Sequence, residues 1–190
     1  MQNISRCPWA NPDNPRYLAY HDHEWGVPLH DDRLLFELLV LESAQAGLSW
    51  ETVLNKRSNY REAFDGFDLH KVAAYDNAKK DALLHNSGII RNRRKIEAAI
   101  DNAKVVIEIQ EEFGSFDSYI WGFVGGVPVI NRFTDIAEVP ASTPLSEKIS
   151  KALKQRGMRF VGPTIIYAYM QAIGMVNDHL RSCFCSPTEI

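Results

Sequence analysis

Histidines, acids and aromatic residues are concentrated in one short segment near the start of the chain. The segment AYHDHEWG, residues 19–26, holds two histidines, two acids and two aromatic side chains. Imidazole and carboxylate groups bind metals or transfer protons, and aromatic rings line pockets. The segment alone is compatible with a catalytic centre, a metal site, a binding pocket or a turn, so partners elsewhere in the chain must decide.

Metal-ligand residue types occur at both ends of the chain. Cys7 lies near the N-terminus, and His179 and Cys183 are four residues apart near the C-terminus. On a helix, residues at this spacing share a face. With Cys7 and an imidazole from His21 or His23, they would close a four-ligand structural zinc site without an open position for water. The alternative is that these side chains are simply packed in the core.

A glutamate falls on the apolar side of a predicted helix. The residues Leu34, Leu35, Leu38, Leu39 and Leu41 recur at helical steps, which predicts a helix over residues 32–46. Glu42 lies on or beside its apolar face, whereas Glu37 is expected in solvent. A buried carboxylate is costly unless a partner satisfies it. Glu42 therefore either reaches water or caps a neighbouring helix, or it points into a pocket as a ligand-binding acid.

The residues after Glu42 predict a tight turn between two helices. Gly47 suits the left-handed conformation that ends a helix, and Ser49 can cap the next helix. Leu48 then lies at the tip of the turn. It is either a hydrophobic contact at the helix end or an exposed wedge of the kind that enters a DNA base stack.

Helical periodicity dominates the remaining chain. It predicts helices over residues 93–112, 116–124, 145–156 and 163–173, the last of them apolar nearly all round. Strand signals are weak: VPVINRF is the best candidate, but Pro128 interrupts it, and residues 125–143 are expected to be irregular. The predicted class is all-α, with residues 1–190 in a single domain.

Two basic segments are candidates for phosphate binding. In RGMRFVGPTIIYA, residues 156–168, Gly157 ends one predicted helix and Gly162 opens the next, where free backbone N–H groups attract anions. Arg159 and the cations before it add positive charge. This pattern resembles a helix-hairpin-helix, although a solvated corner between two helices has the same pattern. The second segment, NSGIIRNRRK, contains Arg91, Arg93, Arg94 and Lys95.

The composition is that of an ordinary globular protein. The 190 residues are 45% hydrophobic and 24% charged, with a net charge of -3. No window approaches the roughly 18 apolar residues of a membrane span, and no signal peptide is visible, so a cytoplasmic location is expected. The charge excludes a uniformly basic nucleic-acid binder but leaves room for a local basic face.

Five motifs together resemble the 3-methyladenine DNA glycosylase I family. YHDHEWG, LESAQAGLSW, GIIRNRRKI, KALKQRGMRFVGPT and GMVNDHLRSCFC occur in the family's order and span nearly the whole chain. The resemblance implies a helix-hairpin-helix glycosylase of base-excision repair. Such an enzyme flips 3-methyladenine out of alkylated double-stranded DNA and releases the free base by hydrolysis.

The resemblance also implies roles for individual residues. Tyr20, Glu42 and Trp50 would line the base pocket, with Glu42 as the acid that reads the base. The implied structural zinc ligands are Cys7, His21, His179 and Cys183, whose site would tie the two ends of the chain into one lobe; His23 and Cys185 are left out. The resemblance also implies that Gly47 and Leu48 contact DNA, and the basic helix-hairpin-helix pattern adds Arg159 and Gly162 as expected DNA contacts.

The pocket motifs contain no lysine for a Schiff base, so a monofunctional hydrolase is expected. Asp178 is a candidate to activate water, although its place beside His179 favours a structural role. The other side chains of the opening segment, Asp22, His23, Glu24 and Trp25, are expected to shape the turn. A monomer that does not bind membranes is also expected.

Three other functions are compatible with the same residues. A zinc-dependent hydrolase would use His21, His23 and a nearby acid, and would need an open metal position. A DNA-binding module would bind methylated DNA without releasing base. A small all-α interaction domain would not bind DNA even at low salt.

Overall fold

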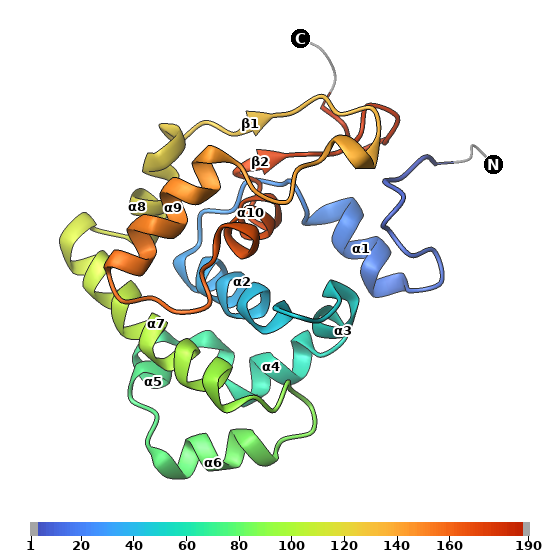
Figure 1. Ribbon diagram of the computed structural model, residues 1–190. Coiled ribbons are helices and arrows are strands. Elements are labelled where there is room, and N and C mark those ends of the chain that lie inside the picture. The colour runs from blue at the N-terminus through green and yellow to red at the C-terminus, as the bar shows by residue number, and fades with distance from the viewer. Residues whose placement is uncertain (1–3, 188–190) are drawn as a thin grey trace.

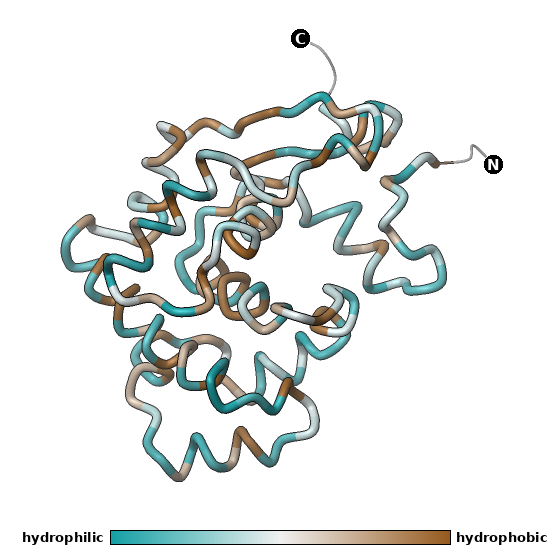
Figure 2. The backbone as a smooth tube through the Cα atoms, viewed as in Figure 1, coloured by the Kyte–Doolittle hydropathy of each residue, from teal (hydrophilic) through white to brown (hydrophobic). Residues whose placement is uncertain are grey.

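Helix α2, Asp32–Gln45, passes through the centre of the hydrophobic core. Every residue from Leu35 to Ala44 is buried, because α3, α7, α8 and α10 all pack against this helix. The hydrophobic residues coloured brown in Figure 2 are accordingly frequent on α2 and α10. Asp31 caps α2 by accepting a hydrogen bond from the Leu34 backbone N–H at 2.9 Å.

The computed structural model describes residues 4–187 (Figure 1). The other α-helices are α1 Pro15–His23, α3 Trp50–Leu54, α4 Arg57–Ala63, α5 Leu69–Ala73, α6 Asn77–His85, α7 Arg93–Phe113, α8 Phe116–Trp121, α9 Pro144–Gln155 and α10 Pro163–Ala172. Short 3-10 segments cover Asp65–Phe67, Gly122–Val124 and Ile136–Glu138. None of the described helices is long and apolar enough to span a membrane.

The structure confirms the helices predicted from periodicity, which are α2, α7, α8, α9 and α10. It also confirms a helix after the predicted Ser49 cap, which is α3, and among the described residues it adds α1 and α4 to α6, which were not predicted. These helices have five to nine residues, too few turns for a clear periodic pattern. Side-chain caps start several of them: Ser49 caps α3, Asp68 caps α5 and Asp76 caps α6.

A two-stranded parallel sheet modifies the predicted all-α class. Strand β1, Val129–Ile130, lies inside the segment expected to be irregular and pairs with β2, Val176–Asn177. The candidate strand VPVINRF is therefore real, and Pro128 immediately precedes its paired residues rather than interrupting them. The sheet joins the connection before α9 to the chain after α10 (Figure 1).

The two chain ends lie side by side (Figure 1). The backbone N–H of Phe184 donates to the carbonyl of Ser5 at 2.9 Å. His179 and Cys183 were predicted to share a face of a helix, and this prediction is wrong because the described chain after β2 is not helical. It forms turns, one of which is closed by the hydrogen bond from the Cys183 N–H to the Leu180 carbonyl.

Glu37 is buried, contrary to its predicted place in solvent. Helix α4 packs beside it and supplies two cations: Arg57 Nε donates to Glu37 Oε1 at 2.5 Å, and Arg61 Nε donates to both carboxylate oxygens. Arg57 also donates to Glu24 Oε2 at 2.6 Å. Helix α4 is too short for a clear periodic pattern, so the cations that compensate Glu37 could not be placed beside it from the sequence.

Replacing Glu37 by alanine should lower the free energy of unfolding by about 3 kcal/mol, since Arg57 loses its buried partner. The matched control is Glu24→Ala, which removes the half-exposed partner of the same guanidinium and should cost less than about 1 kcal/mol. Urea denaturation of the two variants measures both values. Equal losses would contradict the importance of the buried pair.

Candidate functional site

A cavity of about 230 Å³ lies between α1, α2, α3 and α10. This volume is below the roughly 300–1,000 Å³ of pockets that take drug-sized ligands, so it suits one small ring system. Most of its lining side chains are apolar or aromatic. They are Trp9, Tyr17, Tyr20, Trp25, Glu42, Gln45, Trp50, Ile136, Val139, Ala168 and Gln171.

Glu42 is the only carboxylate among these lining residues, and it is only 3% exposed. Burial raises the pKa of its carboxyl group to about 8. Its Oε2 atom has no hydrogen-bond partner among the described residues, and neither has the buried indole N–H of Trp50. Buried polar groups in native proteins are nearly always paired. These two orphaned groups therefore indicate a ligand that completes them.

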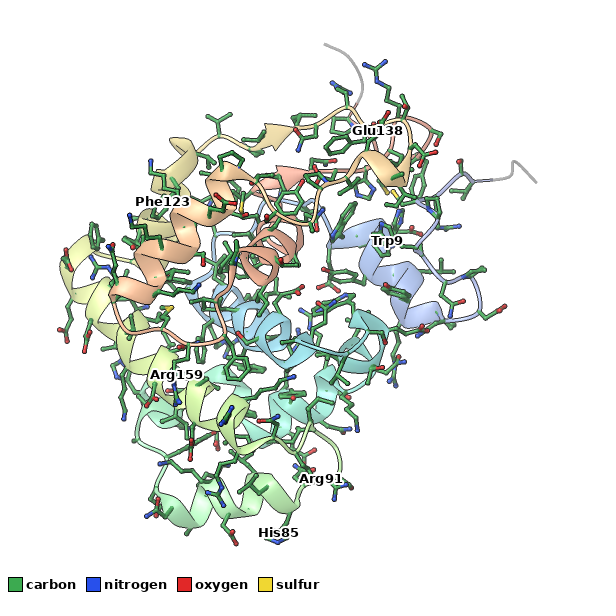
Figure 3. The ribbon with its side chains drawn as sticks, viewed as in Figure 1. Trp9, His85, Arg91, Phe123, Glu138 and Arg159 are labelled. Carbon is green, nitrogen blue, oxygen red and sulfur yellow. The ribbon has the colours of Figure 1, made fainter. Side chains whose placement is uncertain are left out.

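The cavity brings together the three residues that the resemblance assigned to a base pocket. The ring centroids of Tyr20 and Trp50 are 5.3 Å apart, and Glu42 lies in the same lining. Trp25 was expected only to shape a turn, but it also lines the cavity and packs edge-on against Trp9 at 4.8 Å. Trp9, which lies beside α1 in Figure 3, was missed by the sequence reasoning.

Four buried ligand groups meet next to the cavity. The potential ligand atoms of Cys7, His21, His179 and Cys183 all lie within 4.8 Å of one another. The Cys183 sulfur is 3.5 Å from His21 Nε2 and 3.4 Å from His179 Nδ1, and the Cys7 sulfur is 3.6 Å from the same Nδ1. Tetrahedral zinc with ordinary bond lengths separates sulfur and nitrogen ligands by about 3.5 Å. The donor set and its spacing therefore fit a tetrahedral metal ion.

The outer nitrogens of both imidazoles are also paired, as is usual for metal-binding histidines. His21 Nδ1 is 2.8 Å from Asp22 Oδ1, and Arg6 donates to that carboxylate. These two partners hold the pKa of Asp22 at about 2. His179 Nε2 is 3.0 Å from the Trp25 carbonyl. Each ring thus directs its other nitrogen toward the cluster.

The remaining histidine and cysteine candidates lie outside this four-residue cluster. His23 is exposed at the end of α1. Cys185 is half-buried, and its sulfur is 3.8 Å from the Asp22 carbonyl. It belongs to a second possible ligand group with His21 and Asp22.

Consecutive residues of α1 serve the cavity and the cluster. Tyr20 lines the cavity, and His21 is fully buried in the cluster. Trp9 packs against His21 at 5.0 Å, and Trp25 packs against His179 at 4.7 Å, both edge-on. The two tryptophans are therefore shared walls, with the cavity on one side and the metal-ligand groups on the other.

The turn between α9 and α10 is held rigidly against α7. The Asn102 side chain accepts from the Arg159 backbone N–H and donates to the Arg159 carbonyl, each at 2.9 Å. The Arg159 guanidinium pairs with Asp101 at 2.5 Å and remains partly exposed (Figure 3). Gly162 is the N-cap residue of α10. Because glycine has no side chain, it makes no side-chain hydrogen bond to the first backbone N–H groups of this helix.

The turn after α2 agrees with its prediction. Gly47 has a φ of 79°, and Leu48 at the tip is 42% exposed. The expected role of Lys95 is wrong, however: its ammonium donates to the Ala44 and Ala46 carbonyls at 2.7 Å each instead of remaining free for phosphate. Arg91, Arg93 and Arg94 of the same segment are exposed.

Comparison with known proteins places the chain among the glycosylases. The family model described as methyladenine glycosylase matches residues 9–186. DNA-3-methyladenine glycosylase 1 of Escherichia coli K12 is 48% identical over 97% of this chain and 98% of its own length.

Solved structures agree with this family assignment. A crystal structure of 3-methyladenine DNA glycosylase I shares 50% identity and a TM-score of 0.93, over 96% of this chain and all of that one. A Tyr-to-Phe variant of such an enzyme in complex with 3-methyladenine also has a TM-score of 0.93, at 35% identity over 98% of this chain and all of its own. The chain belongs to the methyladenine glycosylase family and is an enzyme of that class.

Replacing Lys95 by methionine should loosen the loop after α2. The change keeps an apolar stem and removes two hydrogen bonds, each contributing about 1 kcal/mol. Amide hydrogen exchange at residues 46–49 should accelerate about tenfold or more. The exposed Arg94→Met is the control and should leave that exchange unchanged. Unchanged exchange in Lys95→Met would show that the loop does not depend on the hydrogen bonds from Lys95.

Proposed function

We propose that the cavity receives 3-methyladenine flipped out of alkylated double-stranded DNA, and that the enzyme hydrolyses its N-glycosidic bond. The observation that carries this proposal is the buried, unpartnered Glu42 carboxyl group in an aromatic cavity sized for one small ring system. An empty apolar pocket does not need such a group, and its burial is costly. The relative crystallised with 3-methyladenine shows that a similar fold binds this base.

The chemistry of the cavity favours a cationic base. Methylation at N3 gives the base in DNA a positive charge. A cation beside Glu42 opposes the effect of burial on its pKa, so the ionised carboxylate can accept a hydrogen bond from the edge of the base and balance that charge. The faces of Tyr20 and Trp50 add cation–π attraction of about 0.5–2 kcal/mol per favourable contact. Neutral adenine gains neither the charge pairing nor the cation–π attraction. The cavity thus distinguishes the lesion from the normal base.

The lining residues suit hydrolysis without strand cleavage. The charged lesion is already a good leaving group, so its departure requires little acid catalysis. The described cavity lining contains no lysine to form a Schiff base, which supports a monofunctional enzyme. Asp178 is buried and accepts hydrogen bonds from three side chains, which supports the structural role expected for it over the activation of water.

The two turns support the proposed contacts with DNA. Leu48 is an exposed apolar side chain at the tip of a turn next to α2, a position suited to fill the space left by the flipped base, with Gly47 allowing the close approach. The α9–α10 turn has the form of a helix-hairpin-helix: Gly162 offers uncapped backbone N–H groups, and Arg159 adds charge. Gly162 and Arg159 are proposed to contact the phosphate backbone.

We further propose that Cys7, His21, His179 and Cys183 hold a structural zinc ion. The ion would contribute folding energy by joining the two chain ends, and it would fix Tyr20 through the neighbouring His21. All four groups are buried, which does not suit the alternative of a hydrolase with an open metal position. The cytoplasmic location and the monomeric state remain predictions.

Replacing Glu42 by glutamine should reduce excision of 3-methyladenine by at least about tenfold, because one lost charge-assisted contact is worth about 1.5–3 kcal/mol. Chromatography of bases released from methylated DNA measures the rate. Glu62→Gln, an exposed substitution on α4, is the matched control and should excise normally. An unchanged rate in Glu42→Gln would remove Glu42 from the site.

The same variant tests the burial of Glu42 without using activity. Because burial raises its pKa from 4.5 to about 8, the folded state binds the proton more tightly than the unfolded state. The contribution of Glu42 to stability therefore falls as pH rises between those values. Glutamine does not titrate, so the gain in Tm of Glu42→Gln over wild type should grow from pH 5 to pH 8. A constant difference would contradict the burial.

Replacing Cys183 by serine should abolish zinc binding and lower Tm by about 10 °C, since about 2–4 °C are lost per kcal/mol in a chain of this size. Cys185→Ser is the matched control, because this neighbouring thiol lies outside the four-residue cluster, and it should keep both zinc and Tm. Elemental analysis of the purified proteins measures the metal. A metal-free wild-type protein with the same Tm as the zinc-loaded form would disprove the proposed role.

A further inference from the structure

We propose that Gln171 is a specificity-determining residue: its carbonyl oxygen, oriented by Asp178, accepts a hydrogen bond from the amino edge of the base and so selects methylated adenine over methylated guanine. This inference rests on the proposed function, because it assumes that the base occupies the cavity. It adds a second acceptor to Glu42 and assigns a task to Asp178.

Gln171 lies near the end of α10 and lines the cavity. Its Nε2 donates to Asp178 Oδ2 at 2.7 Å. Its backbone carbonyl accepts from the Gly26 N–H at 2.9 Å, next to Trp25 of the cavity wall. The residue is therefore fixed at both its main chain and the end of its side chain.

The chemistry of Asp178 determines which end of the Gln171 amide faces it. Asp178 is 1% exposed, and its oxygens also accept from the Tyr167 hydroxyl at 2.5 Å and from Asn131 Nδ2 at 2.6 Å. Asp178 thus acts as a hydrogen-bond acceptor toward its neighbours, and Gln171 Nε2 is its third donor. The NH₂ group of Gln171 must therefore face Asp178, and the carbonyl oxygen is the remaining polar atom of the side chain.

The short sheet explains how Asp178 is positioned. Asn131 directly follows β1 and Asp178 directly follows β2, so the parallel pairing brings both to the same end of the sheet. The Asn131 N–H also donates to the Asn177 carbonyl at 3.0 Å, continuing the ladder by one residue. The two strands thus support the group that orients Gln171.

The orientation has a consequence for the choice of base. The carbonyl oxygen of Gln171 has no hydrogen-bond partner among the described residues, so it is available to a ligand in the cavity. Adenine carries an amino group at the position where guanine carries a carbonyl oxygen. An acceptor facing that position binds adenine and opposes guanine, because two acceptors cannot pair. A site that hydrogen-bonds an N–H rejects analogues lacking it more strongly than an apolar site does.

The test compares Gln171→Met, Asp178→Asn and the double variant with wild type. Methionine keeps the length of the side chain and removes both polar atoms. Asparagine at position 178 can donate to the Gln171 oxygen, which permits the amide to turn over. The control is Gln110→Met, which breaks a similar bond, from Gln110 Nε2 to Asp32 at 2.6 Å, outside the cavity. Thermal unfolding and zinc content establish that each variant is intact.

Single-turnover excision from DNA containing 3-methyladenine or 3-methylguanine gives the preference of each variant. Gln171→Met should reduce the preference for 3-methyladenine about tenfold, and the control should retain it. The double variant should match Gln171→Met, because Asp178 acts through Gln171. An unchanged preference in Gln171→Met would overturn the proposal, as would additive losses in the double variant. If Asp178→Asn does not fold, Gln171→Met decides alone.

Binding of free 3-methyladenine separates failure of this inference from failure of the proposed function. Three tryptophans line the cavity, so a base bound there should change their fluorescence. If the free base produces no change in wild type and does not compete with excision, the proposed cavity is wrong and this inference fails with it. If the base binds in wild type and Gln171→Met keeps the full preference, only the role of Gln171 is wrong.

Discussion

The contact between the two chain ends at four buried cysteine and histidine side chains positions one wall of the cavity. Cys7 and Cys183 are at opposite ends of the chain, and their sulfurs meet the same His179 nitrogen. His21 enters this cluster from α1, so the preceding residue, Tyr20, is directed into the cavity. Trp9 and Trp25 pack on the ligand rings and form adjacent wall. A metal ion there would support binding without taking part in the chemistry.

Two glutamates are buried among residues 4–187, and their charges are compensated differently. Glu37 is compensated by Arg57 and Arg61, so its charge contributes to the packing of α4 on α2. Glu42, five residues later on the same helix, has no paired cation and no hydrogen-bond partner for Oε2 within the part of the chain that the structure describes. A cation supplied by the substrate would compensate it in the same way. The cost of leaving Glu42 unpaired in the free enzyme is consistent with a site that gives up stability for recognition.

The sequence was informative where a residue's environment depends on its own helix. The placement of Glu42 and the bounds of α2, α7, α9 and α10 follow from apolar spacing within single elements. The environments of Glu37 and Lys95 depend on partners distant in sequence, α4 for the first and the end of α2 for the second. Periodicity does not contain that information. The assignment of Tyr20 and Trp50 to one pocket came from the family resemblance.

Trp9 was missed because a single tryptophan in an irregular segment carries no pattern. Its position two residues after Cys7 becomes meaningful only once that cysteine is placed against His179. Strand β2 and its parallel pairing with β1 were not predicted for a similar reason, since each strand has two residues and is defined by its partner. Pairing between distant segments is the information that neither composition nor spacing provides.

The joining of the chain ends also has a consequence for synthesis. The cavity walls come from residues near positions 9–25, 42–50, 136–139 and 168–171, and the cluster beside them requires Cys183. In a chain made from its N-terminus, Tyr20 and Trp25 are therefore synthesised well before Gln171 of the cavity and Cys183 of the cluster. Contacts of such long sequence separation form slowly. The cavity and the cluster beside it are therefore complete only after Cys183 has been added to the growing chain.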